Sequence, residues 1–278
     1  MLKLSMKIFY YTLCLILSIN ILFQLEMDKI VDSDGDGYTD DIELKVGTNP
    51  NDKTDRYYYG AWPYNPNKDS IKGDEFPVSC PGDMGCECTQ NNDCDNQNCA
   101  KSVRGDLYCT PQLGDIFPRF IAVDQYGESV DIYDFAMQGK ILAVEFGAAW
   151  CAPCNDVSVW LSSGNEKIKS NKWWKEEYSV IKEKVDKEEI IFITILYQDE
   201  LKETMDFYGV ESWHNKYPHS KIPVLADEYK DIQEWLMSTG YPCINLLDEN
   251  MRLLTYTSRG LIEAFDILSG IKPMPVLD

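Results

Sequence analysis

Histidines and basic residues are scarce in this sequence. It holds two histidines, and 26 Lys and Arg stand against 46 Asp and Glu, which gives a formal net charge of −20 at pH 7. Such a chain is repelled by nucleic-acid backbones and by anionic lipid, so neither is an expected partner. The charge favours a solvated acidic surface, and the 44% hydrophobic content is enough for an ordinary core. His214 and His219 fall in an expected helix–loop region and are predicted surface residues.

Residues 1–30 are predicted to be a targeting segment, either a signal peptide or a signal anchor. Lys3 and Lys7 precede an uncharged and mostly apolar run from Ile8 to Phe23, which is long for a signal core and slightly short for a spanning helix. No small-residue cleavage site follows it, so cleavage stays open, and a buried helix of the domain is the alternative. We expect an extracytoplasmic protein of the periplasm or cell surface, either secreted or anchored to a membrane through residues 8–23.

An acidic stretch follows in residues 31–56, with side-chain oxygens at alternating positions. Counted from Asp32, they fall at positions 1, 3, 5, 9 and 12 of a loop that has Gly37 at position 6 for a sharp turn. This is the spacing of an EF-hand loop, in which position 7 offers its backbone carbonyl. The stretch therefore predicts a structural Ca²⁺ site, and a solvated acidic linker is the alternative. The predicted ligands are Asp32, Asp34, Asp36, Tyr38, Asp40 and Glu43.

The acidic loop and its continuation Leu44–Asp52 resemble the calcium-binding repeats of thrombospondin type 3. The resemblance implies an EF-hand-like loop without paired helices, in which Asp52 could join the same cage. Residues 57–78, rich in Tyr, Pro, Asn and Gly, are predicted to be a linker, and no helix or strand is expected from Arg56 to Pro77.

Six cysteines are crowded into the predicted module of residues 79–111. With so few apolar neighbours they cannot be held by a hydrophobic core, so in an exported protein they predict three disulfides whose pairing stays open. Zinc is the competing reading, but no histidine is near and the spacing of Cys86 and Cys88 suits it poorly. The module resembles small cysteine-rich modules of secreted bacterial proteins. The cysteines are Cys80, Cys86, Cys88, Cys94, Cys99 and Cys109.

A Cys-x-x-Cys pair stands at the centre of the remaining chain. The β-branched, apolar run Ile141–Phe146 predicts a buried strand, and Trp150-Cys151-Ala152-Pro153-Cys154 follows it at an expected helix start. Unpaired N–H groups and the positive end of the helix dipole favour a thiolate on Cys151. Cys154, one turn into the helix, is placed to attack a mixed disulfide formed by Cys151.

These residues resemble the thioredoxin superfamily, and Gly114–Pro118 and Asp124–Gly127 resemble its extracytoplasmic TlpA/redoxin branch. The resemblance covers roughly residues 114–270. It implies a catalytic role for Trp150, Cys151 and Cys154, with protein thiols and disulfides of exported clients and an upstream redox partner as partners and no organic cofactor.

The resemblance also assigns roles to two further sites. Glu145 would be the buried carboxylate beneath the disulfide, able to accept the proton of Cys154, or a carboxylate turned to the edge. Tyr241-Pro242 would be the cis-proline pair facing the disulfide, preferred over Pro223, with an ordinary trans proline as the alternative. Cys243 is predicted to be a buried strand cysteine, although a third redox thiol is conceivable.

Alternating strands and helices in residues 112–278 predict an α/β fold, a mixed thioredoxin-like sheet flanked by helices. Strands are expected at 190–197, 222–226, 243–247 and 252–256, the last two as a hairpin, and helices at 152–162, 173–187, 200–211 and 227–236.

The predicted function is a thiol–disulfide oxidoreductase, and the chain permits three rival classes. The first is a calcium-binding surface protein whose thioredoxin-like domain is a non-catalytic scaffold. A peroxidase is disfavoured because Ala148 stands where the neighbouring peroxiredoxin branch has Thr or Ser. Copper delivery is disfavoured by the two-residue spacing and the lack of a suitably placed histidine. The direction of electron flow and the client stay open.

Overall fold

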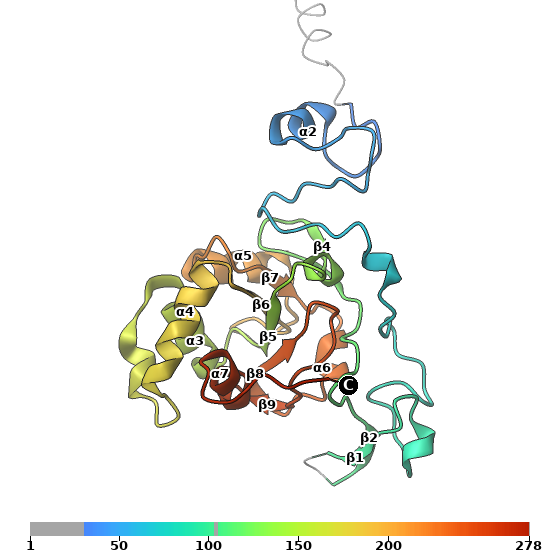
Figure 1. The fold of residues 1–278 in the computed structure, drawn as a ribbon, viewed down its shortest axis with the longest axis vertical. Coiled ribbons are helices and arrows are strands. Elements are labelled where there is room, and N and C mark those ends of the chain that lie inside the picture. The colour runs from blue at the N-terminus through green and yellow to red at the C-terminus, as the bar shows by residue number, and fades with distance from the viewer. Residues whose placement is uncertain (1–30, 103–104, 278) are drawn as a thin grey trace, which may run out of the picture. The chain divides into compact units, whose positions relative to one another are not determined.

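The computed structural model of the protein describes residues 31–102 and 105–277, and the chain divides into two compact units, Met1–Tyr57 and Tyr58–Asp278 (Figure 1). The predicted targeting segment, residues 1–30, lies outside the described residues. Within the described ranges, no helix combines the length and the apolar surface that crossing a bilayer requires.

The described part of the smaller unit is a loop followed by one short helix, α2 (Asp40–Val46). Acidic residues in its first turn suit the positive end of the helix dipole. The helix ends at Gly47, whose positive φ of 97° lets its N–H bond back to the Glu43 carbonyl at 2.7 Å. This turn places Glu43, which is fully buried, against the loop that precedes the helix.

A five-stranded sheet with the order β7-β6-β5-β8-β9 forms the centre of the larger unit. The strands β5, β6 and β7 run parallel, while β8 pairs with β5 in the antiparallel direction. Parallel strands covered on both faces are expected to be apolar throughout, and β5 and β6 are buried along almost their whole length. Their bounds are β5 (Ile141–Gly147), β6 (Ile190–Leu196), β7 (Val224–Ala226), β8 (Gly240–Leu247) and β9 (Arg259–Gly260).

Helices and a hairpin cover the two faces of this sheet. One face packs on α3 (Ala152–Ser163), α4 (Ser179–Asp186) and α7 (Ile262–Leu268), and its core includes Ala143 and Ile244 from the strands. The other face packs on α5 (Phe207–Lys216), α6 (Asp231–Trp235) and the hairpin β3 (Ile121–Val123) and β4 (Ser129–Asp131). The predicted mixed sheet with helices on both faces is confirmed. Short 3₁₀ turns are η3 (Ile132–Phe135), η4 (Glu166–Ser170) and η5 (Glu176–Tyr178).

The predicted strand at 252–256 is wrong. Residues there make isolated bridges, Leu253 to Leu247 at the end of β8 and Arg252 to Ile116, and the edge partner of β8 is β9. Two backbone N–H groups bond here to side chains and not to the carbonyls of a paired strand. Thr255 Oγ1 accepts the Leu246 N–H at 2.8 Å, and Asn245 Oδ1 accepts the Thr257 N–H at 2.7 Å. Short polar side chains of this kind compete with a backbone ladder.

The predicted helices are mostly longer than the observed ones. The helix expected at 200–211 begins only at Phe207, because the Asp206 carboxylate caps it by accepting the Gly209 N–H at 2.9 Å. The helix expected at 173–187 is η5 followed by α4, and the helix expected at 227–236 is reduced to α6. Asp227 lies before α6, and its carboxylate accepts bonds from the N–H groups of Ile232 and Gln233 in the first turn of that helix.

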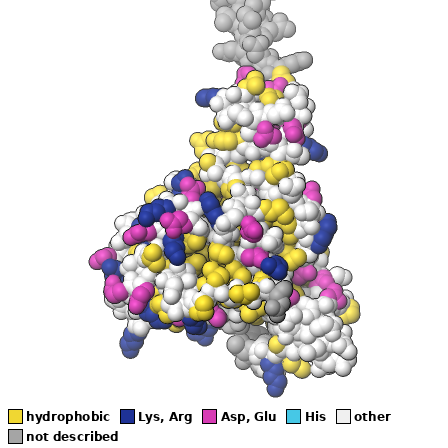
Figure 2. All heavy atoms as spheres, in the orientation of Figure 1, with side chains coloured by type: hydrophobic (Ala, Val, Ile, Leu, Met, Phe, Trp, Pro, Cys, Tyr) yellow, Lys and Arg dark blue, Asp and Glu magenta, His cyan; other side chains and the backbone are white. Residues whose placement is uncertain are grey.

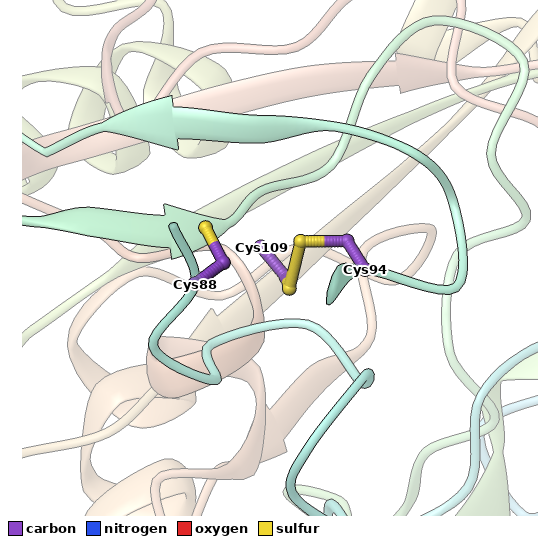
Figure 3. A group of neighbouring side chains, drawn as sticks. All are labelled: Cys88, Cys94 and Cys109. Atoms are coloured by element: carbon purple, nitrogen blue, oxygen red, sulfur yellow. A yellow bond between two sulfur atoms is a disulfide. The ribbon is translucent and has the colours of Figure 1, made fainter. Parts of the chain in front are cut away.

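Three disulfides hold the cysteine-rich module, as predicted. The bonded pairs are Cys80–Cys86, Cys88–Cys99 and Cys94–Cys109, and Figure 3 shows the last beside Cys88. All six sulfurs are therefore in disulfides, so the grouping of Cys88, Cys94 and Cys109 is no thiolate metal site in this state. The module also contains η2 (Asn91–Asp93) and the short pair β1 (Cys99–Lys101) and β2 (Leu107–Cys109).

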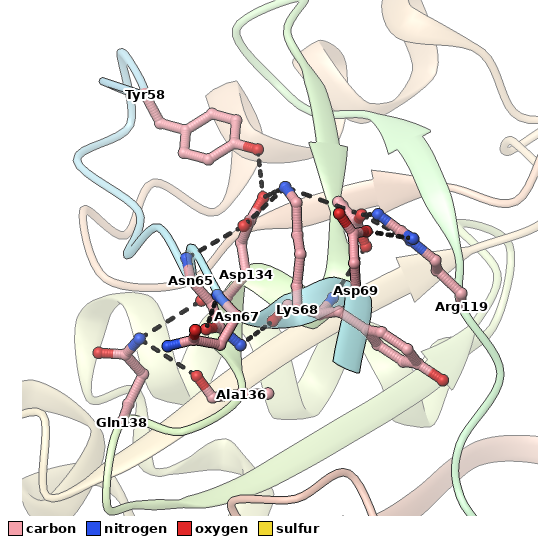
Figure 4. Close-up of polar contacts among 11 residues, drawn as sticks. Tyr58, Asn65, Asn67, Lys68, Asp69, Arg119, Asp134, Ala136 and Gln138 are labelled. Atoms are coloured by element: carbon pink, nitrogen blue, oxygen red, sulfur yellow. Dashed lines mark hydrogen bonds and ion pairs between the residues drawn. The ribbon is translucent and has the colours of Figure 1, made fainter. Parts of the chain in front are cut away.

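The segment 58–77 is fastened to the sheet domain, although only a 3₁₀ turn, η1 (Lys68–Ser70), interrupts its irregular path. The buried Asp134 carboxylate accepts bonds from the Tyr58 hydroxyl at 2.6 Å, the Asn65 N–H at 3.1 Å and the Lys68 ammonium at 2.8 Å (Figure 4). Burial raises the pKa of Asp134 despite the lysine. We call residues 58–77 the strap.

Two tryptophan side chains also fix the strap to the sheet domain, and an asparagine fixes the cysteine-rich module to the segment that follows it. Trp62 Nε1 donates to the buried Asp124 at 2.8 Å, and Trp235 Nε1, from α6, donates to Asp74 at 2.7 Å. Asn96 of the module donates to Asp115 at 2.7 Å. On the face drawn in Figure 2, apolar side chains gather at the centre of the larger unit, with acidic and basic side chains intermixed around them.

Candidate active site and acidic loop

The two cysteines of the Cys-x-x-Cys pair are joined by a disulfide at the N-terminus of α3. Strand β5 ends at Gly147, and Cys151 takes the extended backbone conformation of an N-cap, with its Sγ accepting the Cys154 N–H at 3.2 Å. Asn155 Nδ2 fastens the turn by donating to the Ala149 and Cys151 carbonyls at 2.9 and 2.8 Å. The free N–H groups of the first turn and the helix dipole favour negative charge at Cys151 once the bond is reduced.

An aromatic cluster lies beside the disulfide. Trp150, whose surface is 37% exposed, meets the Tyr241 ring edge-on at 5.8 Å between centroids, and its Nε1 donates to Gln198 Oε1 at 3.0 Å. Tyr241 also packs on Tyr197 at 5.1 Å, and its hydroxyl accepts a bond from Gln233 Nε2 at 2.9 Å. The cluster therefore joins the Cys-x-x-Cys turn, β6, β8 and α6.

The peptide bond between Tyr241 and Pro242 is cis, as predicted. Pro223, the rejected alternative, is not among the prolines that follow a cis bond in the described chain. Two further cis bonds, Phe76–Pro77 and Cys80–Pro81, lie in the strap and the module and were not anticipated. No sequence signal distinguishes them from ordinary turn prolines.

Glu145 is fully buried in the middle of β5. Its Oε2 accepts a bond from Thr194 Oγ1 at 3.2 Å, and its Oε1 has no partner in the described chain. Glu145 and Gly147 share one face of the strand, and a Cβ placed on Gly147 would stand 3.0 Å from Cys154 Sγ. Glu145 thus lies on the face that β5 presents to Cys154.

The environment of Glu145 favours its protonated form. Burial raises its pKa to about 8, and the Thr194 hydrogen bond offsets this only partly. A carboxylic acid with such a pKa holds a proton at neutral pH and can exchange it with a thiol of similar pKa. Thr194 was not identified from the sequence, because a lone threonine in a buried strand gives no signal of its partner.

Cys243 is a buried free thiol, as predicted, and it lies apart from Glu145. It pairs in register with Phe146, so it occupies the opposite face of the sheet. Its Sγ donates to the Thr257 carbonyl at 2.8 Å, and burial raises its pKa to about 12. This thiol is inert toward exchange at neutral pH.

The two histidines are half-buried, which corrects their prediction as surface residues. His214 packs edge-on against Tyr126, and His219 pairs with Asp186 at 3.1 Å. Desolvation is the first cause that lowers the pKa of both rings.

The acidic loop of the smaller unit gathers carboxylates, some of whose oxygens have no hydrogen-bond donor within the described chain. Oxygens of Asp32, Asp34 and Asp36 lie within 4.8 Å of one another. One oxygen each of Asp34, Asp36 and Glu43 is buried without a hydrogen bond from any described residue. Burial and the neighbouring carboxylates raise the pKa of Asp36 and of Glu43. Converging hard oxygens without donors fit a Ca²⁺ ion.

The other predicted ligands are arranged differently. Asp40 turns its carboxylate to Ser33, accepting bonds from the Ser33 N–H at 2.8 Å and Oγ at 2.7 Å. Position 9 of EF-hand loops often reaches the ion through a water, which this arrangement allows. The Tyr38 N–H donates to Asp36 at 2.8 Å and orients the backbone at position 7. Asp52 instead accepts bonds from Thr54, which lower its pKa.

The sheet order, the disulfide at the start of α3 and the cis bond in β8 define a thioredoxin-like fold, as predicted. The family model of the bacterial TSP3 repeat matches residues 32–53. A comparison with curated protein sequences finds no match.

Solved structures with a similar fold have low sequence identity. An exposed lipoprotein thioredoxin from Streptococcus pneumoniae is 19% identical, with 49% of this chain and 86% of that chain covered and a TM-score of 0.35. The thioredoxin domain of a thiol-disulfide oxidoreductase from Bacteroides vulgatus is 21% identical, with 56% of this chain and 97% of that chain covered and a TM-score of 0.38. A protein described as a thiol:disulfide interchange protein DsbE from Chlorobium tepidum is 16% identical, with 58% of this chain and 99% of that chain covered and a TM-score of 0.40.

Proposed function

We propose that the protein is an extracytoplasmic thiol–disulfide oxidoreductase that uses Cys151 as nucleophile and Cys154 as resolving thiol. The observation that carries the proposal is the position of the disulfide. It spans a helix N-terminus beside a buried carboxylic acid that keeps its proton to about pH 8. A structural disulfide needs neither feature.

In the reducing direction, the Cys151 thiolate attacks one sulfur of a client disulfide. The client bond breaks, a mixed disulfide forms, and one client thiolate leaves. The ionised fraction of Glu145, which is the minor form below about pH 8, takes the proton of Cys154. Cys154 then attacks Cys151 Sγ and releases the second client thiolate. The protein disulfide has formed, and two electrons have passed to the client; the oxidising direction is the reverse.

Two residues support this exchange without reacting. Tyr241 and Trp150 form the aromatic edge beside the disulfide, where a client segment would lie. The main chain at Tyr241-Pro242 would orient that segment.

An extracytoplasmic location agrees with the disulfides of the cysteine-rich module. Three structural disulfides in the module persist only in an oxidising compartment. We further propose that the loop binds one structural Ca²⁺ through Asp32, Asp34, Asp36 and Glu43, with the Tyr38 carbonyl and a water held by Asp40. Clients are exported proteins with thiols or disulfides, and an upstream partner renews the redox state.

The test is the reduction potential of the Cys151–Cys154 pair, titrated in glutathione buffers with mass spectrometry. We expect a value between roughly −120 and −270 mV, the range of working catalysts, while the three module disulfides stay oxidised. They serve as the internal control. A bond that resists reduction below about −300 mV would contradict catalysis and favour the non-catalytic scaffold.

A further inference from the structure

A groove of about 380 Å³ opens next to the Cys-x-x-Cys turn. Ala149, two residues before Cys151, forms part of its wall, and the loop after β6 and helix α5 supply other lining residues. That loop is tied to the active site, because Gln198 accepts a bond from Trp150 and its carbonyl accepts the Ala149 N–H at 2.9 Å. The lining residues are Ala149, Asp199, Glu200, Leu201, Asp206, Tyr208, Gly209, Ser212, Trp213 and Lys216.

The groove is acidic. Between Gln198 and Lys216 the sequence holds five acidic residues and two basic ones. Both basic residues are occupied: Lys216 pairs with Glu200 at 2.7 Å, and Lys202 lies over the Trp150 ring at 5.3 Å. Three of the acidic residues, Asp199, Glu200 and Asp206, line the groove itself.

These carboxylates keep capacity for an external cation. Within the described chain, Asp199 accepts bonds from two N–H groups of its own loop and Asp206 accepts one from Gly209 of α5, in each case through Oδ1 only. Each second oxygen is free to face solvent, because neither belongs to the buried unpartnered atoms. A cationic side chain in the groove would meet at least two carboxylates.

Apolar side chains stand exposed on the same groove. Leu201 is 79% exposed and Tyr208 is 72% exposed. Exposed apolar side chains beside charged ones are typical of a protein interaction surface, and aromatic residues contribute strongly to binding there.

We propose that this groove binds a client polypeptide segment that carries Lys or Arg next to an apolar residue, beside the reacting client cysteine. The proposal rests on the proposed redox function and names its substrate class. The occupant is a protein segment of positive charge, because carboxylates line the groove and its wall includes Ala149, two residues before Cys151. Complementary charge raises the rate of encounter more than it raises affinity.

The test uses the full-length protein, reduced beforehand and freed of reductant. Its probes are two peptides with a glutathionylated cysteine next to Leu, identical except for Lys or Glu at the flanking positions. Each turnover forms the Cys151–Cys154 disulfide and releases peptide thiol and glutathione, so two electrons and two protons pass to the products. Stopped-flow tryptophan fluorescence gives the second-order rate constant.

We expect the Lys peptide to react about tenfold faster than the Glu peptide at low salt, with the ratio falling toward one as salt screens the charges. The variant E200Q/D206N, which neutralises two lining carboxylates and leaves the side chain of residue 206 an oxygen to cap α5, should lower this ratio at least threefold. The control E249Q/E263Q makes the same change in net charge at exposed sites outside the groove and should leave the ratio unchanged. Y208S should slow both Leu peptides but not versions with Gly in place of Leu.

Each failure has its own meaning. Equal rates for the two peptides, or a ratio that both double variants lower equally, would overturn the groove and leave the redox function intact. Absence of reaction with either peptide would overturn both proposals. Because Lys216 also contacts Asn155, the reduction potential of the E200Q/D206N protein is measured in parallel. The variant's two rate constants are then compared with those of the wild type at equal driving force. If its Lys-to-Glu rate ratio then equals that of the wild type, this result also counts against the groove.

Discussion

At the scale of single residues, Glu145 has the least ordinary environment in the candidate active site. It combines complete burial, one hydrogen bond and an unpartnered oxygen on the strand that leads to the disulfide. A neutral glutamine of the same size would remove the titration and keep the packing. The protonation of Glu145 is therefore linked to folding.

E145Q should remove a pH dependence of stability. The folded state keeps the Glu145 proton to about pH 8, while the unfolded chain loses it near 4.5. The unfolded state then binds fewer protons between these values, so this residue makes the free energy of unfolding fall as pH rises, by about 1.4 kcal/mol per pH unit. Below pH 4.5 both states are protonated and the effect is absent.

The measurement is urea unfolding of the oxidised protein at pH 5, 6 and 7, followed by tryptophan fluorescence. The quantity compared is the difference between wild type and E145Q, because Asp227, whose pKa is raised to about 7, titrates in both. E263Q, at an exposed site, is the control. A difference that does not change with pH would contradict the assigned pKa.

At the scale of secondary-structure elements, the strap and the ends of the helices hold the cysteine-rich module and the candidate active site in place. The strap has little secondary structure, yet buried carboxylates anchor it at Tyr58, Trp62 and Lys68. Removing one partner of a buried ion pair costs more than the pair contributes, because the other charge is left without compensation.

D134A should therefore destabilise the Tyr58–Asp278 unit by about 3 kcal/mol and speed proteolysis within residues 58–77. K68M/D134N, which leaves neither charge, should recover part of the loss. The matched control is D69A, whose carboxylate is exposed and pairs with Arg119, and it should cost at most about 1 kcal/mol. Equal losses in D134A and D69A would show that the buried anchor does not hold the strap.

At the scale of the whole molecule, the chain joins a thioredoxin-like unit to an acidic loop, and each is expected to need its own chemistry. The loop concentrates carboxylates that repel one another, so a bound cation would stabilise the fold of the smaller unit. The disulfides of the larger unit would be unaffected by that ion.

Ca²⁺ should bind the full-length protein with a dissociation constant of roughly 10⁻⁴ to 10⁻³ M, as in extracellular modules. Terbium luminescence sensitised by nearby tyrosines, competed by calcium, measures it. E43Q should weaken binding at least tenfold, since it removes the terminal carboxylate, whereas D41N, an exposed neighbour, should not. Equal affinity in E43Q and wild type would refute the assigned loop.

The sequence by itself determined the features that depend on local spacing. The Cys-x-x-Cys pair after an apolar strand, the three disulfides among six cysteines, the buried Cys243 and the alternation of strands and helices all follow from neighbouring residues. The choice of Pro242 over Pro223 came from the resemblance to the thioredoxin superfamily, whose cis-proline opens the strand that faces the disulfide. Even so, the hairpin partner of β8 was misplaced, because side-chain bonds from Thr255 and Asn245 replaced a ladder.

Only the tertiary structure decided the features that join distant residues. Disulfide pairing depends on which sulfurs the folded backbone brings together, and fifteen pairings fit six cysteines equally. The partnership of Thr194 with Glu145, the anchoring of the strap by Asp134 and the acidic groove beside Ala149 connect residues far apart in the chain. Burial and hydrogen bonding across such separations arise from packing, and packing leaves no periodic signal in the sequence.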